Sequence, residues 1–314
     1  MAEMDSFEIV DDRFARYLRP DSRVETLFTG MEWGEGPVWF NDGNYLLFSD
    51  IPNNRILRYS EADGVSDWRN PSDFANGNTL DLEGRLITCE HGRRAVSRTN
   101  HDGSVELLVD RYEGGRLNSP NDVVVKSDGT IWFTDPEYGI QDDQIGFESP
   151  NEQGGKCYVF RFDPASGELS VVADDFIMPN GLAFSADESL LYIVDSGGDR
   201  GLDLFSIPDE LPDPHEIRVF DVIDGARLVN SRLFTKVSPG VPDGMRLDSD
   251  GNVWSVAFDG VHCYSPKAEL LGKIKIAEMV ANLTFGGPER NRLFIAGATS
   301  LYAVDLDCLG IQRP

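Results

Sequence analysis

Apolar residues in this chain alternate with polar ones or form short runs, and the spacing of an amphipathic helix is nearly absent. The clearest segment, residues 120–139, reads PNDVVVKSDGTIWFTDPEYG and places two short apolar runs on either side of an Asp-Gly turn. This arrangement predicts a β-hairpin. A second hairpin is predicted at 156–175, with its turn at 164–167, so that four antiparallel strands form one unit.

The same unit recurs along the chain. Aligned on their turns, the copies begin at Glu35, Asn76, Asn121, Asn180, Asp243 and Ala281. Repeated four-stranded units at intervals of roughly 40–60 residues are typical of a β-propeller. The sequence therefore predicts an all-β protein, a six-bladed β-propeller with four antiparallel strands per blade. Two packed β-sandwiches are the alternative, but they give no reason for repeated copies of one unit.

The sixth copy contains only three predicted strands, between residues 282 and 306. Residues 23–29, RVETLFT, form an unpaired strand ahead of the first copy, and we expect this N-terminal strand to complete the sixth blade and close the ring. Closure removes exposed strand edges, which otherwise favour aggregation. Residues 1–314 are therefore expected to form one domain, with residues 1–20 as an N-terminal extension.

The first residues of the repeats are candidates for chemistry. The first strand of each propeller blade borders the central channel, so equivalent residues lie at the same height around one axis. The polar members of this set are Glu35, Asn76, Asn121, Asn180 and Asp243. Buried polar groups are costly without a partner, and a ring rich in oxygen atoms suits a hard divalent cation. The alternative is that the Asn-Gly and Asp-Gly pairs only start strands with turn chemistry.

Four short motifs lie at the starts of these repeats: EGP (35–37), SPNDVVV (119–125), PNGLAFS (179–185) and PDGM (242–245). Together they resemble the gluconolactonase/regucalcin (senescence marker protein) family. Segments 75–92 and 116–139 are similar to bacterial gluconolactonases in particular, and the chain resembles diisopropyl fluorophosphatase more distantly. The resemblance covers about residues 25–305, in register with the repeat.

The resemblance implies a catalytic divalent cation at the mouth of the channel. The oxygen-rich ring favours calcium, with zinc, magnesium or manganese as alternatives. Matched motif by motif, its ligands are Glu35, Asn121, Asn180 and Asp243. The implied reaction is hydrolysis of a sugar lactone, first of all D-glucono-1,5-lactone to D-gluconate, with attack of an activated water on the polarised carbonyl. Asp243 is the implied catalytic acid and base, and Asp122 and Asp135 are rival bases.

Substrate contacts are expected from polar residues near the ends of the inner strands: Asn78, His91, Asn121, Asp122, Asp135 and Tyr138. Residues 139–155 are polar and rich in glycine, which predicts a lid, a disordered loop or an oligomer-contact loop. Two other functions stay open. The same metal site could act on another aldonolactone or an organophosphate ester, or the protein could be a calcium-binding propeller without catalysis.

The composition of the chain limits the classes of molecule that it is expected to bind. The chain has 28 Lys and Arg against 54 Asp and Glu, a net charge of −26, which argues against nucleic acid and anionic membrane surfaces. No apolar run approaches the ~20 residues of a membrane helix, and the acidic N-terminus does not have the form of a signal peptide. We therefore expect a cytoplasmic protein, with a removed leader left open, a small-molecule partner, four buried free thiols, and either a monomer or a homodimer.

Overall fold

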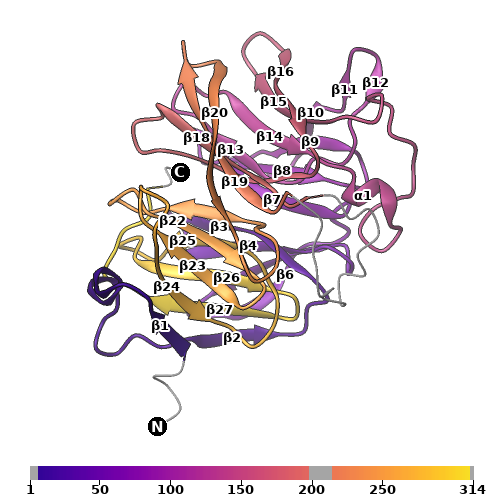
Figure 1. The fold of residues 1–314 in the computed structure, drawn as a ribbon. Coiled ribbons are helices and arrows are strands. Elements are labelled where there is room, and N and C mark those ends of the chain that lie inside the picture. The colour runs from indigo at the N-terminus through magenta and orange to yellow at the C-terminus, as the bar shows by residue number, and fades with distance from the viewer. Residues whose placement is uncertain (1–5, 198–213, 312–314) are drawn as a thin grey trace.

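The computed structural model describes residues 6–197 and 214–311. These residues are nearly all β, with antiparallel sheets arranged as the six blades of a propeller and one short α-helix, α1 (Tyr138–Gln141) (Figure 1). The first strands of consecutive blades are neighbours around the ring. The predicted propeller with four antiparallel strands per blade is confirmed, and one blade carries an additional strand, described below.

The strands of each blade follow one another along the chain, except in the blade that closes the ring. Blade 1 consists of β3 (Gly34–Phe40), β4 (Tyr45–Asp50), β5 (Arg55–Ser60) and β6 (Gly64–Arg69). Blade 2 consists of β7 (Ala75–Leu80), β8 (Leu86–Glu90), β9 (Ala95–Thr99) and β10 (Val105–Val109). A small hairpin of β11 (Arg111–Tyr112) and β12 (Gly115–Arg116) follows.

Blade 3 consists of β13 (Val123–Val125), β14 (Ile131–Asp135), β15 (Cys157–Asp163) and β16 (Glu168–Phe176). Blade 4 consists of β17 (Pro179–Phe184), β18 (Leu190–Asp195), β19 (Glu216–Ile223) and β20 (Arg227–Lys236). Blade 5 consists of β21 (Met245–Leu247), β22 (Val253–Ala257), β23 (Gly260–Tyr264) and β24 (Leu270–Lys275), and blade 6 contains β25 (Val280–Gly286), β26 (Arg292–Gly297) and β27 (Ser300–Asp305).

Backbone hydrogen bonds join the inner strands of neighbouring blades. The Gly77 N–H donates to Asn121 O at 2.8 Å, and the Gly244 N–H donates to Ala281 O at 2.8 Å. A Cβ atom at Gly77 would lie 2.4 Å from Asn121 O, so glycine is required for this close approach. These bonds hold the leading residues of the repeats at a common level.

The ring is closed as predicted. Strand β2 (Glu25–Thr29) pairs antiparallel with β27, and Figure 1 shows the two strands side by side. Blades 6 and 1 share a cluster of buried apolar side chains, in which the Trp39 and Phe294 rings stack with their centroids 5.3 Å apart. The sixth blade is therefore built from both ends of the described chain.

The N-terminal extension has more structure than the sequence pattern indicates. Strand β1 (Phe7–Ile9) pairs with β24 and adds a fifth strand to blade 5. The 3-10 helix η2 (Asp12–Tyr17) then buries Phe14, whose ring centroid lies 5.9 Å from that of Trp254. The extension therefore covers part of blade 5 instead of projecting from the propeller.

All four cysteines are buried and free, as expected. Burial raises the pKa of the Cys89 thiol well above its ordinary value, so its reactive thiolate form is disfavoured at neutral pH. Across residues 6–197 and 214–311, no helix is long and apolar enough to cross a membrane.

Candidate active site

The polar leading residues lie on the inner strands of consecutive blades. Glu35, Asn76 and Asn180 are the second residues of β3, β7 and β17, and Asn121 and Asp243 come two residues before β13 and β21. Asp243 is half-buried, and the other four are at most 5% exposed. Glu35 and Asp243 are close enough for the charge of one to raise the pKa of the other, and Asn180 hydrogen-bonds Asp243.

The sixth blade contributes a residue that the repeat alignment misses. Its leading residue, Ala281, has no polar side chain, but the next residue, Asn282, is 1% exposed and its Nδ2 donates to Glu35 Oε2 at 2.9 Å. The Gly36 N–H donates to the same oxygen at 2.8 Å. Two donors therefore orient the Glu35 carboxylate. The polar Asn282 between the apolar residues Ala281 and Leu283 was the available sequence signal.

Three acidic side chains and one basic side chain form a cluster in this region. Burial raises the pKa of Glu35 to about 7, and it also raises the pKa of Asp122 and Asp243. The charge of Asp122 contributes to the increase at Glu35, and the charges of Glu35 and Asp122 contribute to the increase at Asp243. Arg246 is fully buried, and its Nη1 lies 3.5 Å from Asp122 Oδ2. When all groups are ionised, three carboxylates and one guanidinium leave two negative charges uncompensated.

The donor set of this cluster fits a divalent cation. Asp243 Oδ1 and Asn180 Oδ1 are buried and have no hydrogen-bond partner among the described residues. One divalent cation would neutralise the two uncompensated charges, and carboxylate and amide oxygens are the ligands that calcium prefers. No three His, Cys, Asp or Glu side chains in the described ranges converge on a metal position, because the candidate set has two carboxylates and two amides.

Tyr138 lies in the same region, as the sequence predicts. Its hydroxyl hydrogen-bonds Ser196 and Asn180, and burial together with the nearby Asp243 carboxylate raises its pKa. Ser196 Oγ accepts from Asn180 Nδ2 at 3.2 Å and donates to Pro242 O at 2.7 Å. This hydrogen bond links Pro242, the residue before Asp243, to Ser196 directly after β18 in blade 4. Tyr138 and Ser196 fix Asn180 beside the carboxylate.

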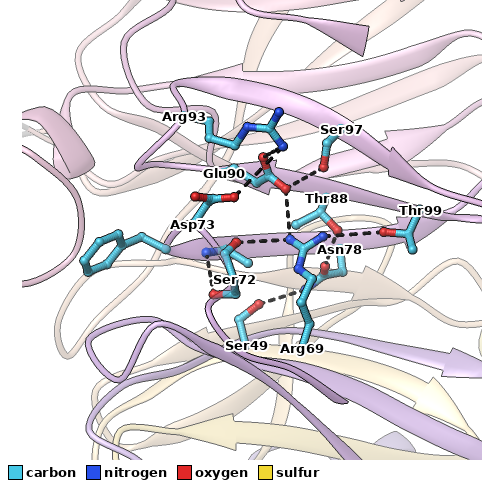
Figure 2. Close-up of polar contacts among 12 residues, drawn as sticks. Ser49, Arg69, Ser72, Asp73, Asn78, Thr88, Glu90, Arg93, Ser97 and Thr99 are labelled. Carbon is cyan, nitrogen blue, oxygen red and sulfur yellow. Dashed lines mark hydrogen bonds and ion pairs between the residues drawn. The ribbon is translucent and has the colours of Figure 1, made fainter. Parts of the chain in front are cut away.

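Both polar atoms of the Asn78 side chain form hydrogen bonds within the protein. Its Nδ2 lies 2.9 Å from Ser49 Oγ and 3.0 Å from Gly36 O, and its Oδ1 accepts from Thr88 Oγ1 at 2.9 Å. Figure 2 shows Asn78 with Ser49 and Thr88 where blades 1 and 2 meet. These contacts favour a structural role, and substrate contact by Asn78 stays a prediction.

Asp135 ends the second strand of blade 3 and binds the loop before the first strand. Its Oδ2 accepts from the Asn118 N–H at 2.8 Å. Asp50 and Asp195 end the second strands of blades 1 and 4 and accept in the same way, from Glu32 N and Met178 N at 3.0 Å each. This repetition favours a structural role for Asp135 over a role as base.

Replacing Asp135 by Asn tests how the burial of this carboxyl group affects stability. Burial raises the pKa of Asp135 to about 7 from an ordinary value of 3.8, so its contribution to stability is largest at low pH and is lost as the pH rises through 7. The amide can still accept from Asn118. We expect Asp135→Asn to lose less unfolding free energy than the wild type between about pH 5 and about pH 8 in urea titrations. Equal losses in the two proteins would show that burial does not raise the pKa of Asp135 in the folded protein.

Residues 139–155 pack against blade 2 and the loop after β12. The backbone oxygen of Ile145 lies 2.9 Å from His91 Nδ1, and the Phe147 and Phe74 rings meet edge to face at 5.3 Å. Burial lowers the pKa of His91 to about 4, so its ring is neutral at neutral pH. His91 therefore links this segment to the ring. A lid function for residues 139–155 stays a prediction.

Comparisons with known proteins identify the family of this chain. The family model of the SMP-30/gluconolactonase/LRE-like region matches residues 33–299. A gluconolactonase of Zymomonas mobilis is 31% identical over 308 residues, which cover 91% of this chain and 82% of that protein. The pentonolactonase XacC of Haloferax volcanii is 28% identical, with 86% and 83% of the two chains covered. A solved gluconolactonase structure from Xanthomonas campestris is 37% identical with a TM-score of 0.87, and 96% and 95% of the chains are covered.

Proposed function

Because the chain belongs to the SMP-30/gluconolactonase/LRE-like family and is an enzyme of the lactone-hydrolase type, we propose that it opens D-glucono-1,5-lactone to D-gluconate with the help of a divalent cation. Calcium is the proposed cation, and Glu35, Asn121, Asn180 and Asp243 are its proposed ligands. The observation that carries the proposal is the cluster of three carboxyl groups and one guanidinium, beside which Asp243 Oδ1 and Asn180 Oδ1 have no hydrogen-bond partner among the described residues.

The residues of the proposed site have different roles in the reaction. A divalent cation held by Glu35, Asn121, Asn180 and Asp243 would supply polarisation of the lactone carbonyl and positive charge for the oxyanion, an effect worth several kcal/mol. Asp243 takes a proton from the attacking water and returns it to the ring oxygen that leaves. Asn282 and Gly36 hold the Glu35 carboxylate, and Tyr138 and Ser196 hold Asn180 beside Asp243.

Lactone hydrolysis followed by pH-stat tests the proposal. The rate is measured on D-glucono-1,5-lactone before and after EDTA, then with calcium, magnesium, manganese or zinc restored, and the spontaneous rate is subtracted. We expect activity to fall with chelation and to return with calcium. Elemental analysis after chelation shows whether the cation has left. Full activity in a protein free of metal would overturn the metal dependence.

A second substrate class has its own support. The relative from Haloferax volcanii is named a pentonolactonase, which favours an aldonolactone of different size as the alternative. A metal-activated water also serves phosphoryl centres, so an organophosphate ester is tested beside the lactones. A higher kcat/KM for a pentonolactone or a phosphorofluoridate than for D-glucono-1,5-lactone would reassign the substrate without changing the site. A protein that binds calcium and hydrolyses none of them would be a non-catalytic calcium-binding propeller.

A further inference from the structure

Asn76 belongs to the polar ring, but its side chain is held differently from those of Asn180 and Asn282. The latter two hydrogen-bond the carboxylates of Asp243 and Glu35. Asn76 Nδ2 instead lies 3.1 Å from His91 Nε2. Asn76 is 3% exposed, and its Oδ1 is buried without a hydrogen-bond partner in the part of the chain that the structure describes. A buried carbonyl oxygen in this position requires a donor from elsewhere.

The tautomer of His91 fixes the direction of the Asn76 amide. His91 Nδ1 lies 2.9 Å from Ile145 O, and because a carbonyl oxygen can only accept, Nδ1 carries the proton. In the neutral ring Nε2 is then an acceptor, so the Asn76 group that faces it is the NH₂ donor. The reverse orientation would set two acceptors against each other. Asn76 Oδ1 therefore points away from His91.

The ring of His91 has little freedom to move. A Cβ atom at Gly139 would lie 2.5 Å from His91 Cγ, so the backbone of α1 packs directly on the imidazole. The His91 N–H donates to Phe74 O at 3.1 Å, and the Phe74 ring contacts Phe147 of the 139–155 segment. The imidazole is thus held on one side by blade 2 and on the other by this segment.

Behind His91, an ionic network fixes the end of β8. Glu90 is fully buried, accepts from Arg69 Nη2 at 2.9 Å and from Ser97 Oγ at 2.6 Å, and pairs with Arg93 at 3.3 Å. Figure 2 shows Arg69, Arg93 and Ser97 converging on this carboxylate. The strand that carries His91 is therefore rigid at the point where His91 leaves it.

We propose that Asn76 Oδ1 accepts a hydrogen bond from a hydroxyl group of the lactone, and that His91 is the positioning residue that holds the amide in this orientation. The inference rests on the proposed lactone hydrolysis. A sugar hydroxyl is a donor that satisfies the buried oxygen. A lactone without that hydroxyl leaves the oxygen unpaired, so the contact selects hydroxylated lactones over bare ones.

The test compares two six-membered lactones that differ in their hydroxyl groups, D-glucono-1,5-lactone and δ-valerolactone. We expect Asn76→Leu, which keeps the shape and removes the acceptor, to lower kcat/KM on the gluconolactone about 10- to 100-fold. The rate on δ-valerolactone should stay within about twofold, because that substrate has no hydroxyl to lose. Single-deoxy gluconolactones then identify the hydroxyl, because Asn76→Leu has no effect on the analogue that lacks it.

His91 variants test the positioning role. His91→Leu should reproduce the substrate-selective loss, and the Asn76→Leu/His91→Leu double variant should lose no more than either single variant, because both remove one interaction. His91→Gln offers an acceptor to Asn76 and should recover part of the selectivity. Additive losses in the double variant would overturn the positioning role.

Calcium titration calorimetry separates a substrate contact from a metal ligand. Asn76→Leu should bind calcium as tightly as the wild type and as Asn100→Leu, a matched exchange in the turn between β9 and β10. A lower calcium affinity in Asn76→Leu alone, or an equal loss of activity on both lactones, would overturn the hydroxyl contact. A wild-type protein that hydrolyses neither lactone would refute the proposed function itself, and the inference with it.

Discussion

Asp243→Asn and Glu35→Gln are each expected to abolish calcium binding and to lower kcat/KM on D-glucono-1,5-lactone by about 10³-fold. Each exchange removes one of the two proposed anionic ligands and leaves the cluster with less negative charge for a dication. The expected loss corresponds to several kcal/mol of transition-state stabilisation. Calcium titration calorimetry and pH-stat rates measure the two effects. Asp102→Asn, in the exposed turn between β9 and β10, is the matched control.

The same variants should differ from the wild type in stability, with a sign that depends on calcium. Burial raises the pKa of Glu35 and Asp243, so without metal their ionised forms destabilise the fold at neutral pH. In EDTA the amide variants should therefore melt at or above the wild-type Tm. Added calcium should raise the Tm of the wild type only. Variants that melt below the wild type in EDTA, or that bind calcium normally, would refute the site.

Arg246→Met is expected to destabilise the protein by about 3–5 kcal/mol. The substitution leaves Asp122 buried with its charge uncompensated, and breaking a buried ion pair from one side has this cost. Urea unfolding measures the change. The double variant Arg246→Met/Asp122→Asn removes both charges and should recover most of the loss. A loss below about 1 kcal/mol in the single variant would show that the pair is not a principal support of the channel.

The ring of leading residues was predictable because the repeat itself encodes it. Residues at one position of a repeated unit lie at one height in the propeller, so Glu35, Asn180 and Asp243 could be grouped from the sequence. The closing strand was predictable for a similar reason, since residues 23–29 had no partner in the first repeat. A closed propeller has a place for one additional strand.

Arg246, Asp122 and Asn282 were harder to place because they do not repeat. The position after the leading residue is glycine in four blades. Asp122 and Asn282 are the exceptions, and each also contacts a residue of another blade. Arg246 of blade 5 pairs with Asp122 of blade 3. A contact between two different blades leaves no periodic pattern in the sequence. A buried ion pair of this kind becomes visible only when the blades are assembled.

The structural role favoured for Asp135 could have been anticipated from the repeat. Asp50, Asp135 and Asp195 all end the second strand of a blade, and a residue that recurs in this way serves the architecture more often than a single reaction. Strand β1 had no comparable signal. Its three residues are too few to establish an alternating pattern, and its pairing with β24 depends on the folded blade 5.

The closure of blade 6 sets the order in which the protein can be assembled during synthesis. Thr29 of β2 and Ser300 of β27 are hydrogen-bonded across 271 residues of sequence. Strand β2 leaves the ribosome early and must wait for its partner, while blades 1 to 4 can pair their strands as they emerge. Until translation has delivered β27, the nascent chain carries an unpaired edge at its seam. A ribosome that stalls in the last blade therefore holds a nearly complete propeller in its most aggregation-prone form.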